Sequence, residues 1–163
     1  PYADREGIKD KHVVAIEEED LRVVILDSLM YVNKVPGLLG KEQRNWLGEY
    51  LATKSDKPVV LFVHHTLENN DGDLLDAPLL FELIEPHRHV KAIFFGHSHV
   101  WSIENRGHVK LVNLPAVGYN FRDQDPVGWV DARFDRAGVD LTLRAIGGNK
   151  TEDRKITRVD WIA

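Results

Sequence analysis

The chain has 163 residues, a size typical of one domain, and 43% of them are hydrophobic and 29% charged. No apolar run approaches the ~20 residues that span a bilayer, so we expect no membrane partner. Because 26 acidic residues face 21 basic ones, the formal net charge is -5, which argues against a nucleic-acid polymer as partner. The chain has no cysteine, so any metal ion would be held by histidine, carboxylate, amide or water.

The sequence begins at Pro1 without the basic and apolar segments of a signal peptide. We therefore expect a cytoplasmic protein whose true N-terminus is absent from this sequence. No linker, repeat or low-complexity tract interrupts the chain, which predicts a single domain over residues 1–163.

The first half of the chain predicts a hairpin followed by a helix. Residues 12–16 and 21–26 are rich in valine and isoleucine and flank the acidic segment 17–20, a pattern typical of a β-hairpin with an exposed turn. The apolar residues of segment 41–53 recur at helical spacing, which predicts an amphipathic helix.

Two apolar runs, residues 59–63 and 90–95, predict central strands covered on both faces. Between them Asp76 is placed to cap a helix with Pro78 in its first turn. We expect this helix to turn four apolar side chains inward: Leu79, Leu80, Leu83 and Ile84. A strand, a helix and a strand in this order build a parallel sheet.

After residue 99 the pattern becomes alternating. Residues 100–103 with 109–114, and residues 129–134 with 139–146, predict two antiparallel hairpins. The expected fold class is therefore α/β, with a mixed sheet and two flanking helices followed by antiparallel strands.

Histidines follow both predicted central strands: His64 and His65 after the first, and His97 and His99 after the second. The carboxyl ends of parallel strands meet at one edge of a sheet, so these side chains should converge on a metal site. Neighbouring residues such as His64 and His65 point to opposite sides, so we expect only one of them to be a ligand. His97 and His99 could reach two atoms of a dinuclear centre. We assign structural roles to the remaining histidines, His12, His87, His89 and His108.

Residues 22–121 resemble the calcineurin-like metallophosphoesterase family, in particular its cyclic-nucleotide and glycerophosphodiester phosphodiesterase branch. Gly-His-x-His at residues 96–99 carries most of the resemblance, together with His-His at 64–65, Leu-Asp-Ser at 26–28 and Asn-Leu-Pro at 113–115. The resemblance implies the C-terminal half of an αββα sandwich. It also implies hydrolysis of a small phosphoester by a dinuclear centre of divalent or trivalent ions, either Mn, Fe or Zn.

By position, the resemblance implies that His64 and His97 bind one ion and His99 the other, while His65 supports them without binding. The acidic loop with Asp71 and Asp73 would overhang the substrate side. The competing interpretation of that loop is an ordinary solvated segment next to a helix cap.

The family's bridging aspartate, its asparagine ligand and the histidine that protonates the leaving group belong to an N-terminal half, which we expect this chain to lack. We therefore expect no catalytic acid here, at most one weakly bound ion and an inactive isolated chain. An exposed strand edge would favour pairing with the missing half or self-association. The alternative function is a non-catalytic metal-binding or interaction module with a degenerate phosphoesterase fold.

Overall fold

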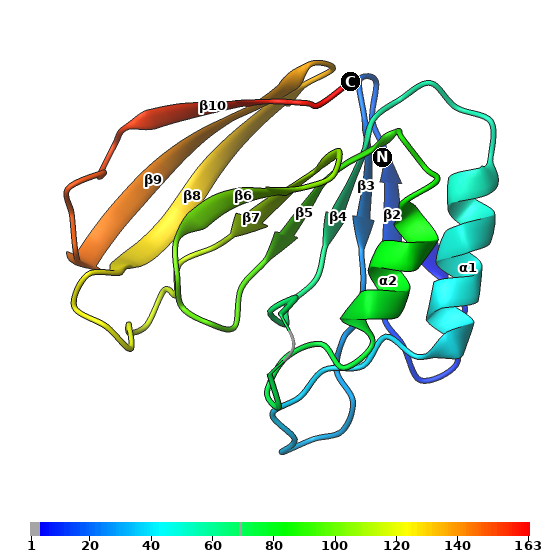
Figure 1. Ribbon diagram of the computed structural model, residues 1–163, viewed down its shortest axis with the longest axis horizontal. Coiled ribbons are helices and arrows are strands. Elements are labelled where there is room, and N and C mark those ends of the chain that lie inside the picture. Colours follow the sequence, from blue (N-terminus) through cyan, green and yellow to red (C-terminus); the bar gives the residue numbers. More distant parts are fainter. Residues whose placement is uncertain (1–3, 69) are drawn as a thin grey trace.

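The computed structural model describes residues 4–68 and 70–163. In this part of the chain, seven strands form a mixed sheet in the order β1-β2-β3-β4-β5-β7-β6, and three form an antiparallel sheet in the order β10-β9-β8. Helices α1 (Lys41–Ala52) and α2 (Ala77–Ile84) cover one face of the larger sheet, and the smaller sheet lies over part of the other face (Figure 1). The predicted α/β class, with two flanking helices followed by antiparallel strands, is confirmed.

The strands follow the predicted runs closely and add two that were not predicted, β1 and β10. In chain order they are β1 (Asp4–Glu6), β2 (Val13–Glu17), β3 (Arg22–Ile25), β4 (Val59–Phe62), β5 (Val90–Phe95), β6 (Ser102–Arg106), β7 (Val109–Asn113), β8 (Pro126–Asp135), β9 (Gly138–Gly148) and β10 (Ile156–Asp160).

The centre of the larger sheet is parallel. Strands β3, β4, β5 and β7 run side by side in the same direction, with Leu61 paired to Ile93 and Ile93 paired to Leu111. Leu61 and Ile93 pack toward the helices, whereas Phe94 packs toward the smaller sheet, and all three are almost fully buried. Burial on both faces explains why these strands are uniformly apolar.

For α2, one prediction was wrong and another holds only for the position of the residue. Leu79 is 47% exposed, because the eight-residue helix turns only one face to the sheet and buries Leu80 and Ile84 there. Asp76 occupies the N-cap position with Pro78 in the first turn, as predicted, but its carboxylate makes no capping hydrogen bond to the helix. It accepts hydrogen bonds from the backbone N–H groups of Leu39 and Gly40 at 2.9 Å each and pairs with the Arg44 guanidinium. Asp76 therefore ties the start of α2 to the start of α1.

None of the helices in the described residues is long and apolar enough to cross a membrane.

A buried arginine lies at the end of the sheet where the parallel strands begin, opposite the end that carries the histidines. Arg22 is 2% exposed, donates to the Thr53 hydroxyl at 2.9 Å and lies over the ring of Tyr50. His89, at the start of β5, lies in the same region. Burial lowers the pKa of His89, and the positive charge of Arg22 lowers it further. Both effects favour the neutral form of His89 in the folded protein.

This makes the stability of the fold depend on pH. As pH falls below the ordinary histidine pKa of about 6.5, His89 binds a proton in the unfolded chain but not yet in the folded chain. The free energy of unfolding therefore decreases. The loss ends once the pH passes the folded pKa. We expect His89→Gln to flatten the decrease measured by urea unfolding between about pH 7 and about pH 5. The exposed His12 offers a control, because His12→Gln should keep the wild-type slope. Equal slopes for wild type and His89→Gln would refute the assignment.

Candidate metal centre

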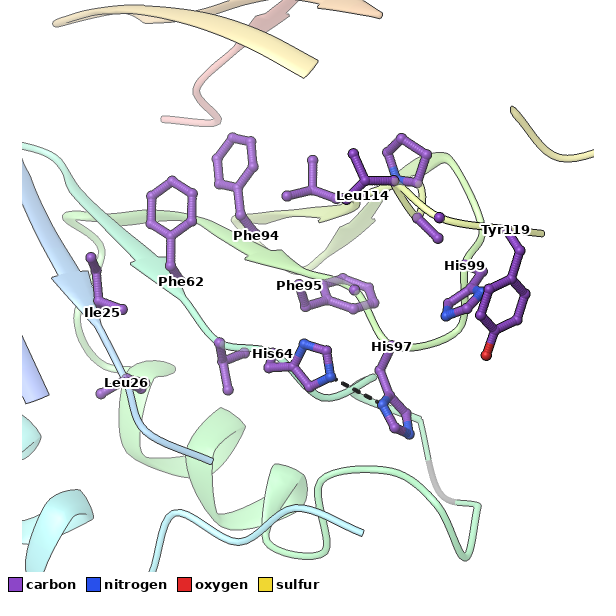
Figure 2. Close-up of a pocket in the computed structure, with 16 residues that line it drawn as sticks. Ile25, Leu26, Phe62, His64, Phe94, Phe95, His97, His99, Leu114 and Tyr119 are labelled. Atoms are coloured by element: carbon purple, nitrogen blue, oxygen red, sulfur yellow. Dashed lines mark hydrogen bonds between the residues drawn. The ribbon is translucent and has the colours of Figure 1, made fainter. Parts of the chain in front are cut away.

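The structure brings His64 and His97 together at the carboxyl ends of β4 and β5. The chain bends directly after β4, so His64 turns toward the loop that follows β5. The Nε2 atom of His64 lies 3.2 Å from the Nδ1 atom of His97, and the two rings meet edge to face (Figure 2). Burial lowers the pKa of His64, with a smaller contribution from His97 and His99. A neutral imidazole is the form that binds a metal ion.

His65 has a different role, because both of its ring nitrogens are already used within the protein. Nδ1 lies 2.7 Å from the Ser28 hydroxyl, and Nε2 lies 3.0 Å from the carbonyl oxygen of Val35. A carbonyl can only accept, so Nε2 carries the proton and Nδ1 accepts from Ser28. Burial lowers the pKa of His65, which favours this neutral form. His65 thus holds the loop of residues 27–40 against the end of β4. Neither of its ring nitrogens is left to bind an ion.

His99 lies apart from the other two predicted ligands. Its ring stacks on Phe121, with centroids 4.3 Å apart, and meets Tyr119 edge to face at 4.6 Å. Its Nδ1 atom is buried without a hydrogen-bond partner. Within residues 4–68 and 70–163, no group of three histidines or carboxylates is arranged to hold an ion. The assignment of all three histidines as ligands therefore stays a prediction.

The loop that carries His97 and His99 has a strained backbone. Both residues adopt positive φ values, 70° and 60°, which non-glycine residues rarely do. Hydrogen bonds on both sides hold this loop in place. The Asn113 amide donates to the Ser98 hydroxyl at 2.7 Å, and the Thr66 hydroxyl donates to the carbonyl of Gly96 at 2.9 Å. Strain of this kind persists only where the surroundings fix it, and it clusters at functional sites.

The acidic loop approaches the histidines, but its carboxylates have separate roles. A Cβ atom added to Gly72 would lie 4.0 Å from Nε2 of His97, so the loop lies beside this histidine. Asp73 is 7% exposed and accepts two hydrogen bonds from Asn70 at 3.0 Å, which close the loop on itself. Asp71 is exposed. The placement of Asp71 on the substrate side stays a prediction, whereas the carboxylate of Asp73 supports the loop.

Two segments match the family's N-terminal metal motifs by letter, although we expected this chain to contain none of those motifs. Asp10-Lys11-His12 fits Asp-x-His, and residues 72–76 fit Gly-Asp-x-x-Asp. The carboxylates of Asp73 and Asp76 are already bound within the protein, as described above. His12 is exposed at the start of β2 and takes part in no metal-binding group of the described residues. The matches are therefore not part of this centre.

A cavity of about 580 Å³ adjoins the histidines. His64, His97 and His99 line one end of it, and most of its remaining lining is apolar. Ile25 and Phe62 line it on the part of the larger sheet that the smaller sheet leaves uncovered, and the buried Phe94 lines it next to the smaller sheet (Figure 2). Ile25 is 41% exposed although it belongs to a central strand. The site is thus a histidine cluster at the end of an open apolar surface.

This arrangement, a mixed sheet with histidines after two parallel strands, agrees with comparisons to known proteins. Residues 7–101 match the family model described as calcineurin-like phosphoesterase. The chain belongs to the calcineurin-like phosphoesterase family.

The curated relatives have related names. A "Probable cyclic nucleotide phosphodiesterase" from Synechococcus is 30% identical over 115 residues, which cover 66% of this chain and 44% of that protein. A protein of the same designation from Psychrobacter is 29% identical over 58% of this chain and 31% of its own length. The chain thus spans less than half the length of these two relatives.

Solved structures show the same fold. A dimetal phosphatase from Danio rerio superposes with a TM-score of 0.72 at 11% identity, covering 93% of this chain and 61% of that one. The structure of PhoD gives a TM-score of 0.67 at 15% identity, covering 91% of this chain and 40% of that one.

The contact between His65 and Gly37 can be tested by substitution. A methyl group at Gly37 would lie 2.4 Å from the His65 ring, so Gly37→Ala must displace the ring or the loop. We expect a loss of about 1–3 kcal/mol in the free energy of unfolding, measured with urea. Gly48→Ala in α1 is the matched control, because its nearest neighbour would be Leu83 at 3.7 Å. That change should be neutral or stabilise the protein by up to about 1 kcal/mol. Similar values for both variants would contradict the tight contact.

The strained loop offers a second test. Ser98→Ala leaves the buried Asn113 amide without its partner and should lower the free energy of unfolding by about 1–3 kcal/mol. Ser98→Thr keeps the hydroxyl and should lose less than half as much. Chemical denaturation of the three proteins distinguishes the cases, and equal losses for alanine and threonine would show that the hydrogen bond is unimportant.

Proposed function

We propose that this chain is part of a metal-dependent phosphodiesterase or phosphatase, and that it supplies histidine ligands to a dinuclear centre. The proposal rests mainly on one contact: Nε2 of His64 lies 3.2 Å from Nδ1 of His97. This contact lies at the carboxyl ends of β4 and β5, in a chain of the phosphoesterase family. The names of the curated relatives favour a phosphodiester substrate.

The side chains present suit Mn, Fe or Zn, which accept imidazole nitrogen. His64 and His97 would hold one ion, and His99 would hold the second. When bound, such ions neutralise charge on the phosphate oxygens and activate water for attack on phosphorus. His65, Ser28 and the loop of residues 96–99 keep the ligand rings in place, and the strained backbone reduces the freedom of the loop.

Among the described residues, no carboxylate completes the proposed centre. Neutral imidazoles leave the charge of an ion uncompensated. We propose that the remaining ligands come from polypeptide that corresponds to the part of the relatives outside the matched region. That polypeptide would cover Ile25 and Phe62 and pair with the part of the β8 edge that lies beyond the bridge between Ala116 and Val127.

Metal binding by the purified chain tests this proposal. After dialysis with Mn and Zn, plasma mass spectrometry should find at most one weakly held ion per chain. His97→Ala should weaken binding of that ion by at least about tenfold, since one of two adjacent ligands is lost. His12→Ala, on an exposed side chain, is the control and should bind as wild type does.

Two other results would count against the proposal. Two ions per chain would show that carboxylates of this chain complete the centre. One tightly bound ion that survives His97→Ala would favour a structural metal site elsewhere, as expected for a non-catalytic module.

A further inference from the structure

Strand β6 forms a free edge of the larger sheet. It is the last strand in the order of that sheet, so it pairs with β7 on one side and with no strand of the described residues on the other (Figure 1). Its last three residues, Glu104, Asn105 and Arg106, are exposed. Its register with β7 is continuous, without a bulge that would bend the edge away. An edge of this kind can accept another strand.

The turn after β6 determines which backbone groups face this edge. Gly107 and His108 connect β6 to β7, and Gly107 has a positive φ of 59°, as the first position of a two-residue hairpin turn requires. Arg106 and Val109 flank this turn and form a hydrogen-bonded pair, and such pairs alternate with non-bonded ones along a hairpin. The N–H and C=O groups of Asn105 therefore point away from β7, toward the free edge.

Two side chains of opposite charge lie on the helix-covered face of this edge. The guanidinium of Arg106 lies over the ring of Phe81 in α2, 3.9 Å from the ring centroid. Glu104, two residues earlier in the strand, points to the same face. Neither charge forms an ion pair with another side chain in the described part of the chain. By contrast, Arg158 on the outer strand β10 already pairs with three aspartates.

We propose that the free edge of β6 pairs with β6 of a second copy of this chain, antiparallel about a two-fold axis at Asn105. In this register the two Asn105 backbones exchange hydrogen bonds, and Glu104 of each copy lies opposite Arg106 of the other. The segment Glu-Asn-Arg is thus complementary in charge to itself, so a second copy supplies the partner that this edge lacks. An axis at Glu104 would instead place two glutamates opposite each other, which is destabilising.

Two cavities beside β6 support this arrangement. They have volumes of about 260 and about 270 Å³, and Leu67, Glu68 and Arg106 line both of them. Because its contact with Phe81 orients the Arg106 guanidinium, that side chain loses little freedom when Glu104 of the second copy reaches it. The two-fold axis reverses the strand direction, so the histidines of the two copies lie at opposite ends of the joined sheet. The inference therefore does not depend on the proposed function.

Sedimentation velocity of the purified chain tests the pairing. Because a strand of five residues buries less than a standard interface, we expect a weak dimer that becomes populated between about 10 μM and about 1 mM. Glu104→Arg places arginines opposite each other and should weaken the dimer by at least about tenfold. The double variant Glu104→Arg/Arg106→Glu restores opposite charges and should return to within about threefold of wild type. Arg133→Glu, a charge reversal at an exposed position of β8, is the control and should dimerise as wild type does.

Hydrogen exchange identifies the surface. The amide of Asn105 should exchange at least about threefold more slowly at about 1 mM than at about 10 μM, whereas the amides of residues 96–99 should not change. A chain that stays monomeric at every concentration would overturn the inference. So would a double variant that associates as weakly as Glu104→Arg. Loss of the dimer in Arg133→Glu would assign the contact to β8 instead.

Discussion

The parallel pairing of β3, β4, β5 and β7 is the constraint on which the site depends. Strands that run in one direction end at one edge, so the segments that follow them are neighbours in space although 33 residues separate His64 from His97. The register is fixed by apolar side chains on both faces. Phe62 pairs with Phe94, and their rings stack 4.9 Å apart just before the two histidine segments begin. A slip by one residue would turn both segments to the wrong side of the sheet.

Buried hydrogen bonds hold the loops at the carboxyl ends of the parallel strands. His65 connects the end of β4 to Ser28 and Val35, and Asp76 connects α2 to Leu39 and Gly40. Each contact joins segments 30 or more residues apart in sequence. A buried carboxylate or imidazole is costly unless it is hydrogen-bonded, so these contacts stabilise one arrangement of the loops against all others. They provide the rigid support that a strained histidine loop requires.

Much of the fold could be predicted from the sequence. The spacing of apolar residues and the points where strands end depend on nearby residues only. The central strands and α1 lie where the pattern placed them. The role of Asp76 could not be predicted in this way. A helix cap is the common local solution for aspartate before a helix, whereas its true partners lie in a distant loop. The ring of His99 was also beyond prediction, since its orientation depends on Tyr119 and Phe121, 20 or more residues later. Sequence spacing shows which backbone positions are adjacent, but not which partner a side chain prefers.

The apolar surface and the histidines share one cavity, and this has a physical consequence for the proposed enzyme. Any polypeptide that covers Ile25 and Phe62 also reaches the edge where His64 lies, because these residues line the same space. Burial of the apolar face supplies a favourable free energy that does not depend on metal. Under the proposed function, an ion at the histidines would gain carboxylate ligands only when that face is covered. In the proposed enzyme, covering the sheet and completing the metal centre would then be a single event, with hydrophobic burial stabilising a site that the histidines alone would hold only weakly.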